Sequence, residues 1–263
     1  MKTSEIITHI EKTAPLCNAA PWDNSGMQVA AVRDTVSHVA LMLDPTPRGI
    51  ATALKMGADM IVSHHPLAIT PRLPRVLDDF HTVLSLLFSR DVPLYSAHTS
   101  LDSNLHGPAS WLADAFGLTN RQALEHTADH PEGEPHYGFG VVGDLPSPLP
   151  YALFTDTLAA LLKKTTWRAS GPMPETVSRM AYCPGSGEPF LHTAAALGAD
   201  IYITGDMKYH AALEAPIRTL DVGHFILEEI MMRTFADQLR TSLAPITISY
   251  FEAADPFIIE GVA

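Results

Sequence analysis

A short segment occurs twice in this chain, and it constrains the fold more than any other feature. Residues 56–63 read MGADMIVS, residues 197–204 read LGADIYIT, and a helical stretch with Ala and Leu precedes each copy. Glycine commonly ends a helix, and an apolar run behind it is typical of a strand. The repeat predicts one helix–turn–strand unit used twice. Chance reuse of glycine at helix-to-strand turns is the alternative.

The echo continues at the strand that follows each unit. The segment AHTSLD ends one strand-like run and GHFILE ends another, so His98 matches His224 and Asp102 matches Glu228. We therefore expect an α/β fold of two similar α/β lobes, an internal repeat, with a dinuclear metal site in the cleft between them. Side chains from both lobes would reach that cleft: His64, His65 and Asp102 from the first, His224 and Glu228 from the second.

Polar and proline-containing segments suggest where the first lobe ends and the second begins. We expect the first α/β lobe at residues 1–125 and the second at residues 126–263, with the C-terminal segment packing back on the first. Residues 125–136 are polar and contain two prolines, so they are the best linker or exposed loop. A second loop at residues 146–150 should lead into a helix over residues 151–163. Its apolar face would be formed by Leu153, Leu158, Leu161 and Leu162.

Good metal ligands follow two of the expected strands. His64 and His65 close the apolar run MIVS, and His224 follows the run LDVG with Glu228 four positions later. Open α/β sheets bind ligands at the carboxyl ends of their strands, and imidazole with carboxylate suits zinc, iron, manganese or nickel. Taken singly, each residue has a structural alternative: a strand-ending turn for the His-His-Pro segment, and a cap at a sheet edge for His224.

The spacing of these ligands favours two metal ions rather than one. Neighbouring side chains on an extended backbone point to opposite sides, so His64 and His65 are poorly placed to chelate a single ion. His224 and Glu228 stand four residues apart at the start of an expected helix, residues 225–233, and would project from one face. A carboxylate there can bridge two ions held about 3.5 to 4 Å apart.

These residues resemble a known family, the YbgI-like proteins, also described as GTP cyclohydrolase I type 2 homologues and related to the yeast Ngg-interacting factor three. Six segments carry the resemblance, in order, along nearly the whole chain: WDNSGMQV at 22–29, HHPL at 64–67, AHTSLD at 97–102, GSG at 185–187, GADIYITGDMKYH at 198–210 and DVGH at 221–224. The resemblance implies a toroidal hexamer and a dinuclear site for two divalent metal ions. The ligands that it carries over are His64, His65, Asp102, His224 and Glu228, with Glu228 as the bridge.

Two glycine-rich segments have different interpretations. Residues 138–143, GFGVVG, fit the dinucleotide-binding fingerprint, but that motif needs a helix to open at its last glycines, and DLPSP follows instead. We interpret this segment as a glycine-rich strand. Gly185, Ser186 and Gly187 lie between a strand-like segment and a helix, where backbone N–H groups could hold a phosphate or carboxylate of the substrate. A tight strand-to-helix turn is an equal alternative.

Other polar residues are candidates for contact with substrate. Asp206, Lys208 and His210 replace the positions where the first unit has its metal ligands, so they could line the cleft and contact substrate, or equally form hydrogen bonds at a helix start. Residues 22–24 could form either the wall of a pocket or an ordinary turn. The repeat makes His98 a ligand by analogy with His224, whereas the resemblance leaves it beside the ligands. We follow the resemblance and expect His98 to transfer a proton as a catalytic residue.

Composition limits the partners and the compartment. The formal net charge of −12 argues against nucleic acid as a main partner, because non-specific affinity for it depends on Lys and Arg. No apolar run approaches the ~20 residues needed to span a bilayer. The N-terminal residues resemble a capped amphipathic helix and not a signal peptide. Two cysteines, Cys17 and Cys183, favour a reducing, cytoplasmic location.

These observations favour one function and leave one alternative. The expected function is dinuclear metal-dependent hydrolysis of a small phosphorylated or nucleotide-like substrate, and only the resemblance suggests GTP cyclohydrolase activity. The partners would be that small molecule and further copies of this chain, most simply as a closed homo-oligomer. The alternative is a non-catalytic metal-binding adaptor or metal-handling protein. An open coordination position would distinguish the two, since catalytic metals keep one.

Overall fold

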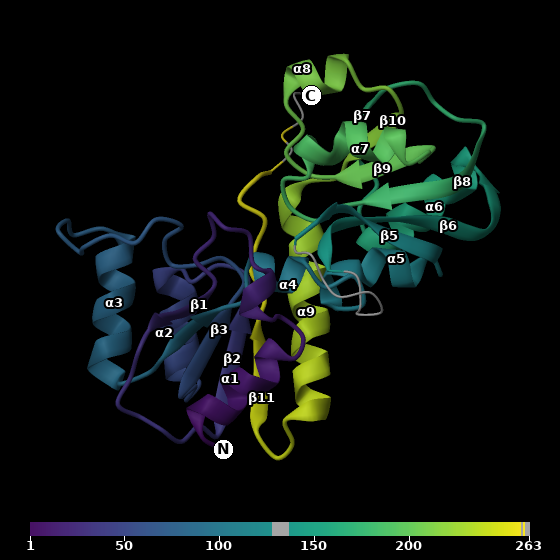
Figure 1. Ribbon diagram of the computed structural model, residues 1–263. Helices are drawn as coiled ribbons and strands as arrows, with labels where there is room; N and C mark the ends of the chain where they lie inside the picture. The colour runs from purple at the N-terminus through teal and green to yellow at the C-terminus, as the bar shows by residue number, and fades with distance from the viewer. Residues whose placement is uncertain (128–136, 259, 261–263) are drawn as a thin grey trace.

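The computed structural model describes residues 1–127, 137–258 and 260, which form two α/β lobes (Figure 1). The sheet of the first lobe has the strand order β1-β4-β3-β2-β11, and that of the second has the order β5-β6-β8-β9-β10-β7. The strands of the first sheet are β1 (Gly26–Val29), β2 (His38–Met42), β3 (Met60–Ser63), β4 (Leu94–Ser96) and β11 (Thr247–Phe251). Those of the second are β5 (Thr119–His126), β6 (Gly138–Pro150), β7 (Arg168–Ser170), β8 (Thr176–Tyr182), β9 (Ile201–Thr204) and β10 (Arg218–Asp221).

Helices connect these strands in both lobes. Those before β5 are α1 (Thr3–Glu11), η1 (Leu16–Asn18), α2 (Pro47–Lys55), α3 (Asp79–Arg90), α4 (Thr99–Asp102), η2 (Pro108–Ser110) and α5 (Trp111–Ala115). Those after it are α6 (Tyr151–Leu162), η3 (Glu188–Phe190), α7 (Leu191–Ala196), α8 (Tyr209–Leu213) and α9 (His224–Ser242). Within the described residues, none of these helices combines the length and the apolar character that crossing a membrane would need.

Four strands have the same order and direction in the two lobes. In the first, β2, β3 and β4 are parallel neighbours and β1 pairs antiparallel with β4. In the second, β8, β9 and β10 are parallel neighbours and β7 pairs antiparallel with β10. The strand order therefore agrees with the prediction of two similar α/β lobes.

The repeated Gly-Ala-Asp turn has one structure in both lobes. Gly57 and Gly198 follow α2 and α7 with φ of +84° and +79°, a left-handed conformation that glycine adopts readily. The carboxylate two positions later, on Asp59 or Asp200, accepts hydrogen bonds from backbone N–H groups near the start of the neighbouring strand, β2 or β8. The glycine lets the chain leave the helix, and the aspartate ties the turn to the sheet. Both roles explain why the segment recurs.

The lobes differ in the strands added beside β2 and β8. β11 lies parallel to β2, so the chain returns to the first sheet after building the second. On the other side, β6 pairs antiparallel with β8, and β5 pairs antiparallel with β6. The expected boundary at residues 125/126 thus falls inside β5, a strand of the second sheet. Residues 128–136 of the expected linker lie outside the described residues.

The helix α9 joins the two lobes. It begins just after β10 of the second sheet and runs along the first lobe, where it packs against β2 and β11 (Figure 1). Its first turns are held by Trp111, whose indole N–H donates to the carbonyl oxygen of Leu227 at 2.9 Å. Its buried side chains join a hydrophobic core that includes Leu41 of β2 and Ile203 of β9. One continuous core therefore supports both lobes.

Several local predictions can be compared with these elements. α1 forms at the N-terminus as expected. Residues 138–143 lie in β6, so the glycine-rich strand is confirmed. The expected loop at residues 146–150 is wrong, because these residues continue β6. The register shift between Asp144 and Leu149 lets the strand accommodate Pro146 and Pro148, which have no N–H to donate to a neighbouring strand.

The position of α6 agrees with the prediction, but its buried face differs in part. Leu158 and Leu162 are buried as expected, whereas Leu153 is 51% exposed. Phe154 takes the inward position and stacks on Phe116, with ring centroids 4.8 Å apart. The sequence pattern could not choose between two adjacent large apolar residues.

Glycine-to-alanine substitutions can separate the cost of backbone conformation from the cost of crowding. Gly57→Ala and Gly198→Ala should each lower the free energy of unfolding by about 1 kcal/mol, because φ is positive but the added Cβ meets no atom within 4 Å. Gly171→Ala should cost clearly more, since at a φ of +71° its Cβ would lie 2.1 Å from the Ile217 carbonyl oxygen. Urea unfolding measures all three, and equal losses would contradict crowding at Gly171.

Candidate metal centre

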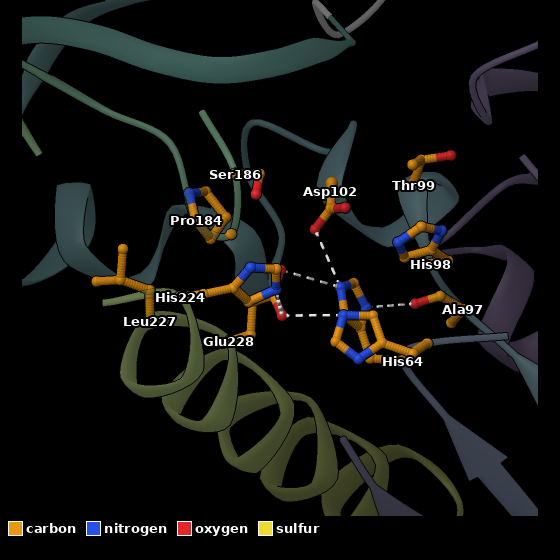
Figure 2. A network of polar contacts seen from close by, with 12 residues as sticks. His64, Ala97, His98, Thr99, Asp102, Pro184, Ser186, His224, Leu227 and Glu228 are labelled. Carbon is orange, nitrogen blue, oxygen red and sulfur yellow. Dashed lines mark hydrogen bonds and ion pairs between the residues drawn. The ribbon is translucent and has the colours of Figure 1, made fainter. Parts of the chain in front are cut away.

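Six side chains from the ends of strands converge at the cleft between the lobes (Figure 2). They are His64 and His65 after β3, His98 and Asp102 after β4, and His224 and Glu228 after β10. The carboxyl ends of neighbouring parallel strands meet at one edge of each sheet, which is where α/β proteins bind ligands. The residues singled out in the sequence as metal ligands, together with the candidate catalytic histidine, therefore form one cluster.

The two adjacent histidines face the same cluster, contrary to the expectation that they would point apart. β3 ends at Ser63, and the backbone bends at His64 and His65. Their ring centroids lie 5.0 Å apart. The alternation expected of an extended strand does not apply beyond its last residue, so both rings can turn toward the cleft.

The Glu228 carboxylate lies at the centre of the cluster. Its Oε1 is 3.6 Å from Nε2 of His64, and its Oε2 is 3.2 Å from Nε2 of His65 and 2.7 Å from Nε2 of His224. The two oxygens thus face different histidines, which is the arrangement of a carboxylate that can bridge two ions. Only 4% of the residue is exposed.

Each of the four histidines has its Nδ1 atom held by an oxygen, which leaves Nε2 directed into the cluster. The acceptors are the Ala97 carbonyl for His64 at 2.9 Å, Asp44 for His65 at 2.7 Å, Asp23 for His98 at 2.6 Å and Asp206 for His224 at 2.7 Å. Carbonyl and ionised carboxylate oxygens only accept hydrogen bonds, so Nδ1 carries the proton when the ring is neutral. Nε2 then keeps its lone pair for a metal, and metal-binding histidines are commonly oriented this way.

Asp23 is a buried carboxylate that fastens the first lobe around His98. Besides the His98 ring, it accepts hydrogen bonds from Ser25 Oγ at 2.6 Å, from the Asn24 N–H at 2.6 Å and from the Thr99 N–H at 3.1 Å. Burial alone would raise its pKa, but the bonds from His98, Ser25 and Thr99 outweigh burial and hold the pKa of Asp23 well below its usual range. It is therefore ionised and keeps the His98 ring in one orientation.

The neighbouring charges change the proton affinities of the cluster. Burial opposes protonation of both His65 and His224, yet hydrogen bonds to Asp44 and Asp206 and the negative charge of Glu228 raise the pKa of His65 to about 10 and that of His224 to about 9. Burial would also raise the pKa of Glu228, but the surrounding histidines lower it well below the ordinary value. In the metal-free protein, the protonated rings of His65 and His224 therefore balance the negative charge of the buried Glu228 carboxylate.

Buried polar atoms show that the donor set fits metal ions. Among the described residues, Nε2 of His64, Oδ1 of Asp102, Nε2 of His224 and Oε2 of Glu228 are buried without a well-formed hydrogen bond. Nε2 of His224 and Oε2 of Glu228 are only 2.7 Å apart, but their geometry is not that of a hydrogen bond. Unsatisfied buried polar atoms are costly, and imidazole nitrogens and carboxylate oxygens of this kind are ligands for divalent cations. The cluster can thus hold metal ions.

Two groups of ligand atoms can be distinguished, and they share His65. Within each group the atoms lie within 4.8 Å of one another; one contains His64, His65 and His98, and the other His65, His224 and Glu228. Asp102 belongs to neither group, although its Oδ1 is 3.7 Å from Nε2 of His64. The geometry therefore places His98 as close to a metal position as the residues predicted to be ligands.

The glycine-rich turn after β8 packs against the cluster. An added Cβ at Gly185, where φ is +66°, would lie 2.3 Å from Oε1 of Glu228, so only glycine leaves room for that carboxylate. The Gly187 N–H donates to Thr204 Oγ1 at 2.9 Å and is not free to hold a phosphate. Ser186 donates to Asp206 at 2.6 Å and lines the cavity beside the cluster. At Gly187, then, the tight turn is the better interpretation.

Asp206 and Lys208, both candidates for contact with substrate, have different surroundings. Asp206 holds the His224 ring, so its contact with the cluster is through a histidine. The Lys208 side chain is 82% exposed and lies 3.5 Å from Glu188, and it lines neither of the two large cavities of the cleft. The sequence analysis missed Asp44, which holds the His65 ring. Its place two residues after the end of β2, at the same edge of the sheet as the histidines, is the signal that could have identified it.

A cavity of about 610 Å³ opens onto the cluster. His98, Asp102 and Glu228 line its polar side. Its apolar walls include Trp22, from the segment left open between a pocket wall and a turn, and Phe139 and Phe190, whose rings stack with centroids 6.5 Å apart. The candidate ligands thus face a space that a small molecule can enter.

Comparisons with known proteins agree with this fold. A sequence model of the family described as Duf34/NIF3 (NGG1p interacting factor 3) matches residues 1–256. A Clostridium perfringens protein named GTP cyclohydrolase 1 type 2 homolog is 30% identical over 264 residues, which cover 98% of this chain and 99% of that protein.

Solved structures show the same fold. A Bacillus cereus protein related to NIF3 superposes with a TM-score of 0.87 at 22% identity, covering 99% of both chains. The protein ybgI, described as of unknown function, superposes with a TM-score of 0.82 at 24% identity, covering 98% of this chain and 100% of that one.

Gly185→Ala should weaken metal binding without removing any ligand. The added Cβ would displace Oε1 of Glu228, and loss of a ligand's positioning lowers metal affinity about 10- to 100-fold. Competition with a chromogenic chelator measures the affinity. Gly198→Ala is the matched control, since it also replaces a glycine of positive φ but meets no neighbour. Equal affinities in the two variants would contradict the packing of Gly185 on Glu228.

The protonated histidines predict how the metal-free protein responds to pH. Because the folded-state pKa values of His65 and His224 are raised to about 10 and about 9, their contribution to stability is fully present below pH 6.5. It should be lost as pH rises through 9 and 10, and zinc affinity should rise over the same window because fewer protons must be displaced. Urea unfolding after chelation, and zinc titration, measure the two slopes. His224→Ala should flatten both, and a stability that rises with pH would overturn the assignment.

Proposed function

The chain belongs to the Duf34/NIF3 family, and from this premise we propose that it is a dinuclear metal-dependent hydrolase of a small phosphorylated or nucleotide-like substrate. The proposed ligands are His64, His65, Asp102, His224 and Glu228. A GTP cyclohydrolase reaction is the specific version suggested by the names of the curated relatives. Two divalent ions, drawn from zinc, iron, manganese and nickel, suit these nitrogen and oxygen donors.

The observation that carries the proposal is the open side of the cluster. The cavity of about 610 Å³ is lined by His65, His98, Asp102, His224 and Glu228 at once. Structural metal sites are closed by four protein ligands, whereas catalytic sites keep a position for water or substrate. A cavity that reaches the ligand atoms supports catalysis over a purely structural role.

The side chains would divide the work of hydrolysis. When bound, the two ions would polarise the scissile group and lower the pKa of an attacking water. Glu228 would hold both ions, because each of its oxygens faces a different histidine. His98 would take a proton at Nε2, since its Nδ1–H is committed to the ionised Asp23. Asp23 would stabilise the imidazolium ion that results.

The cavity also bears on the class of substrate. Trp22, Phe139 and Phe190 offer apolar contact to a ring, but no Lys or Arg is among the described residues that line this cavity. The negative charge of a phosphorylated substrate in this cavity would therefore be neutralised by the divalent ions. Assembly into a homo-oligomer, most simply a hexamer, stays a prediction.

Histidine substitutions test the proposed roles. His98→Ala should retain about two metal ions per chain while GTP hydrolysis by the metal-replete protein falls roughly a hundredfold, as for loss of a general base. His224→Ala should lose metal and hydrolysis together, because its Nε2 faces Glu228. Elemental analysis and product release measure the two. If His98→Ala loses metal as His224→Ala does, His98 is a ligand, in line with its closeness to His64 and His65.

A further inference from the structure

A second cavity lies on the other side of the metal cluster. It has a volume of about 690 Å³ and shares His65 and His224 with the first cavity. Other parts of its walls come from Leu43 and Asp44 in the first lobe, from residues 164, 166–168, 206 and 221–225 in the second lobe, and from residues 255–257 after β11. Figure 1 shows this C-terminal segment passing from the first lobe to the second. The two histidines therefore separate two spaces, of which only the first contains the carboxylates of the cluster.

The second cavity contains cationic side chains, which the described lining of the first one lacks. Lys164 and Arg168 both line it. Arg168 is paired with the buried Asp221, but Lys164 has no carboxylate of the described residues within ion-pair distance. Its Nζ donates one hydrogen bond, to the Val222 carbonyl at 2.9 Å, which fixes the ammonium group beside the turn into α9. Two of its three N–H donors remain for a ligand.

Four aspartates also line this cavity, but each is already engaged. Asp44 and Asp206 accept from the rings of His65 and His224. Asp221 accepts from the backbone of Met207 and Gly223 as well as from Arg168, and Asp255 accepts from the Phe257 N–H at 2.9 Å. These bonds do not cancel the negative charges, but they occupy the carboxylates, and Lys164 is the cation of this lining that has no carboxylate partner among the described residues.

Aromatic side chains line the same cavity as this ammonium group. The half-buried Trp167 is three residues from Lys164, and Phe225 follows His224 on α9. Indole offers a wide flat surface on which a heterocycle can stack. A cation with free donors beside such a surface suits a ligand that carries a phosphate and a flat ring.

We propose that the second cavity binds the phosphate and the ring of a nucleoside monophosphate, with Lys164 on the phosphate and Trp167 against the base. Such a ligand would lie against His65 and His224, next to the metal cluster. The inference rests on the proposed function in one respect, since it locates the anionic part of the substrate class proposed there.

Binding to the full-length, metal-replete protein tests the proposal. Guanosine 5′-monophosphate, guanosine and inorganic phosphate are titrated separately by calorimetry, and bound metal is measured for every variant. Lys164→Met should weaken guanosine 5′-monophosphate and phosphate about tenfold or more, as loss of a charge-assisted hydrogen bond implies. Lys164→Arg should restore binding. Trp167→Leu should weaken the nucleotide and guanosine but leave phosphate unchanged.

Lys163→Asn is the matched control. It removes the same charge one residue earlier, outside both cavities, and asparagine tolerates the φ of +51° found there. Metal content should be unchanged in all these variants. The proposal is overturned if the nucleotide does not bind at about millimolar concentration, or if Lys164→Met binds it as Lys163→Asn does. Binding through Lys164 without any hydrolysis would contradict the proposed function alone, and hydrolysis untouched by Lys164→Met would contradict this inference alone.

Discussion

The buried carboxylate of Glu228 is the interaction on which the arrangement of the cleft depends. A charge that is 4% exposed must be compensated, and its partners His64 and His65 belong to the other lobe. Its helix, α9, therefore has to cross from the second lobe to the first, where it packs against β2 and β11. Gly185 completes the constraint by leaving space for one carboxylate oxygen. The candidate metal site and the contact between the lobes therefore depend on the same carboxylate and the same helix.

The repeat supplies similar frames, but the two lobes use them differently. After β3 the first lobe carries the pair His64 and His65, whereas after β9 the second carries Gly205 and Asp206. A Cβ at Gly205 would lie 2.5 Å from the backbone nitrogen of His224, so a histidine there would collide with the helix that carries Glu228. Asp206 instead orients His224, as Asp23 orients His98. One lobe thus contributes more of the candidate ligands, while the other contributes the carboxylate whose two oxygens face different histidines.

The acceptors that hold the histidines also separate the two cavities. Asp44 and Asp206 lie on the side of the second cavity, while Asp102 and Glu228 face the first. His65 and His224 are held from behind by carboxylates and present Nε2 forward. In the function that we propose, one face of the cluster would serve the reacting group and the other the remainder of the ligand, with the imidazole rings of His65 and His224 between them.

Much of the fold and cluster could be predicted from the sequence, because the signals are local. Gly57 and Gly198 mark two turns of the same conformation, and histidines or carboxylates directly after apolar runs mark strand ends. The prediction of a loop at residues 146–150 was wrong because the register between β6 and β8 shifts at this point, and the shift lets the strand continue through its prolines. Residue type and spacing alone determined the two-lobe α/β plan and the kinds of donor in the cleft. Only the tertiary structure decided that His98 stands among the donors, that Asp23 and Asp44 hold histidines far along the chain, and that Lys164 and Trp167 line one cavity with His65. Those contacts join segments that are far apart in the sequence, and neither residue type nor spacing indicates which distant segments meet in the folded chain.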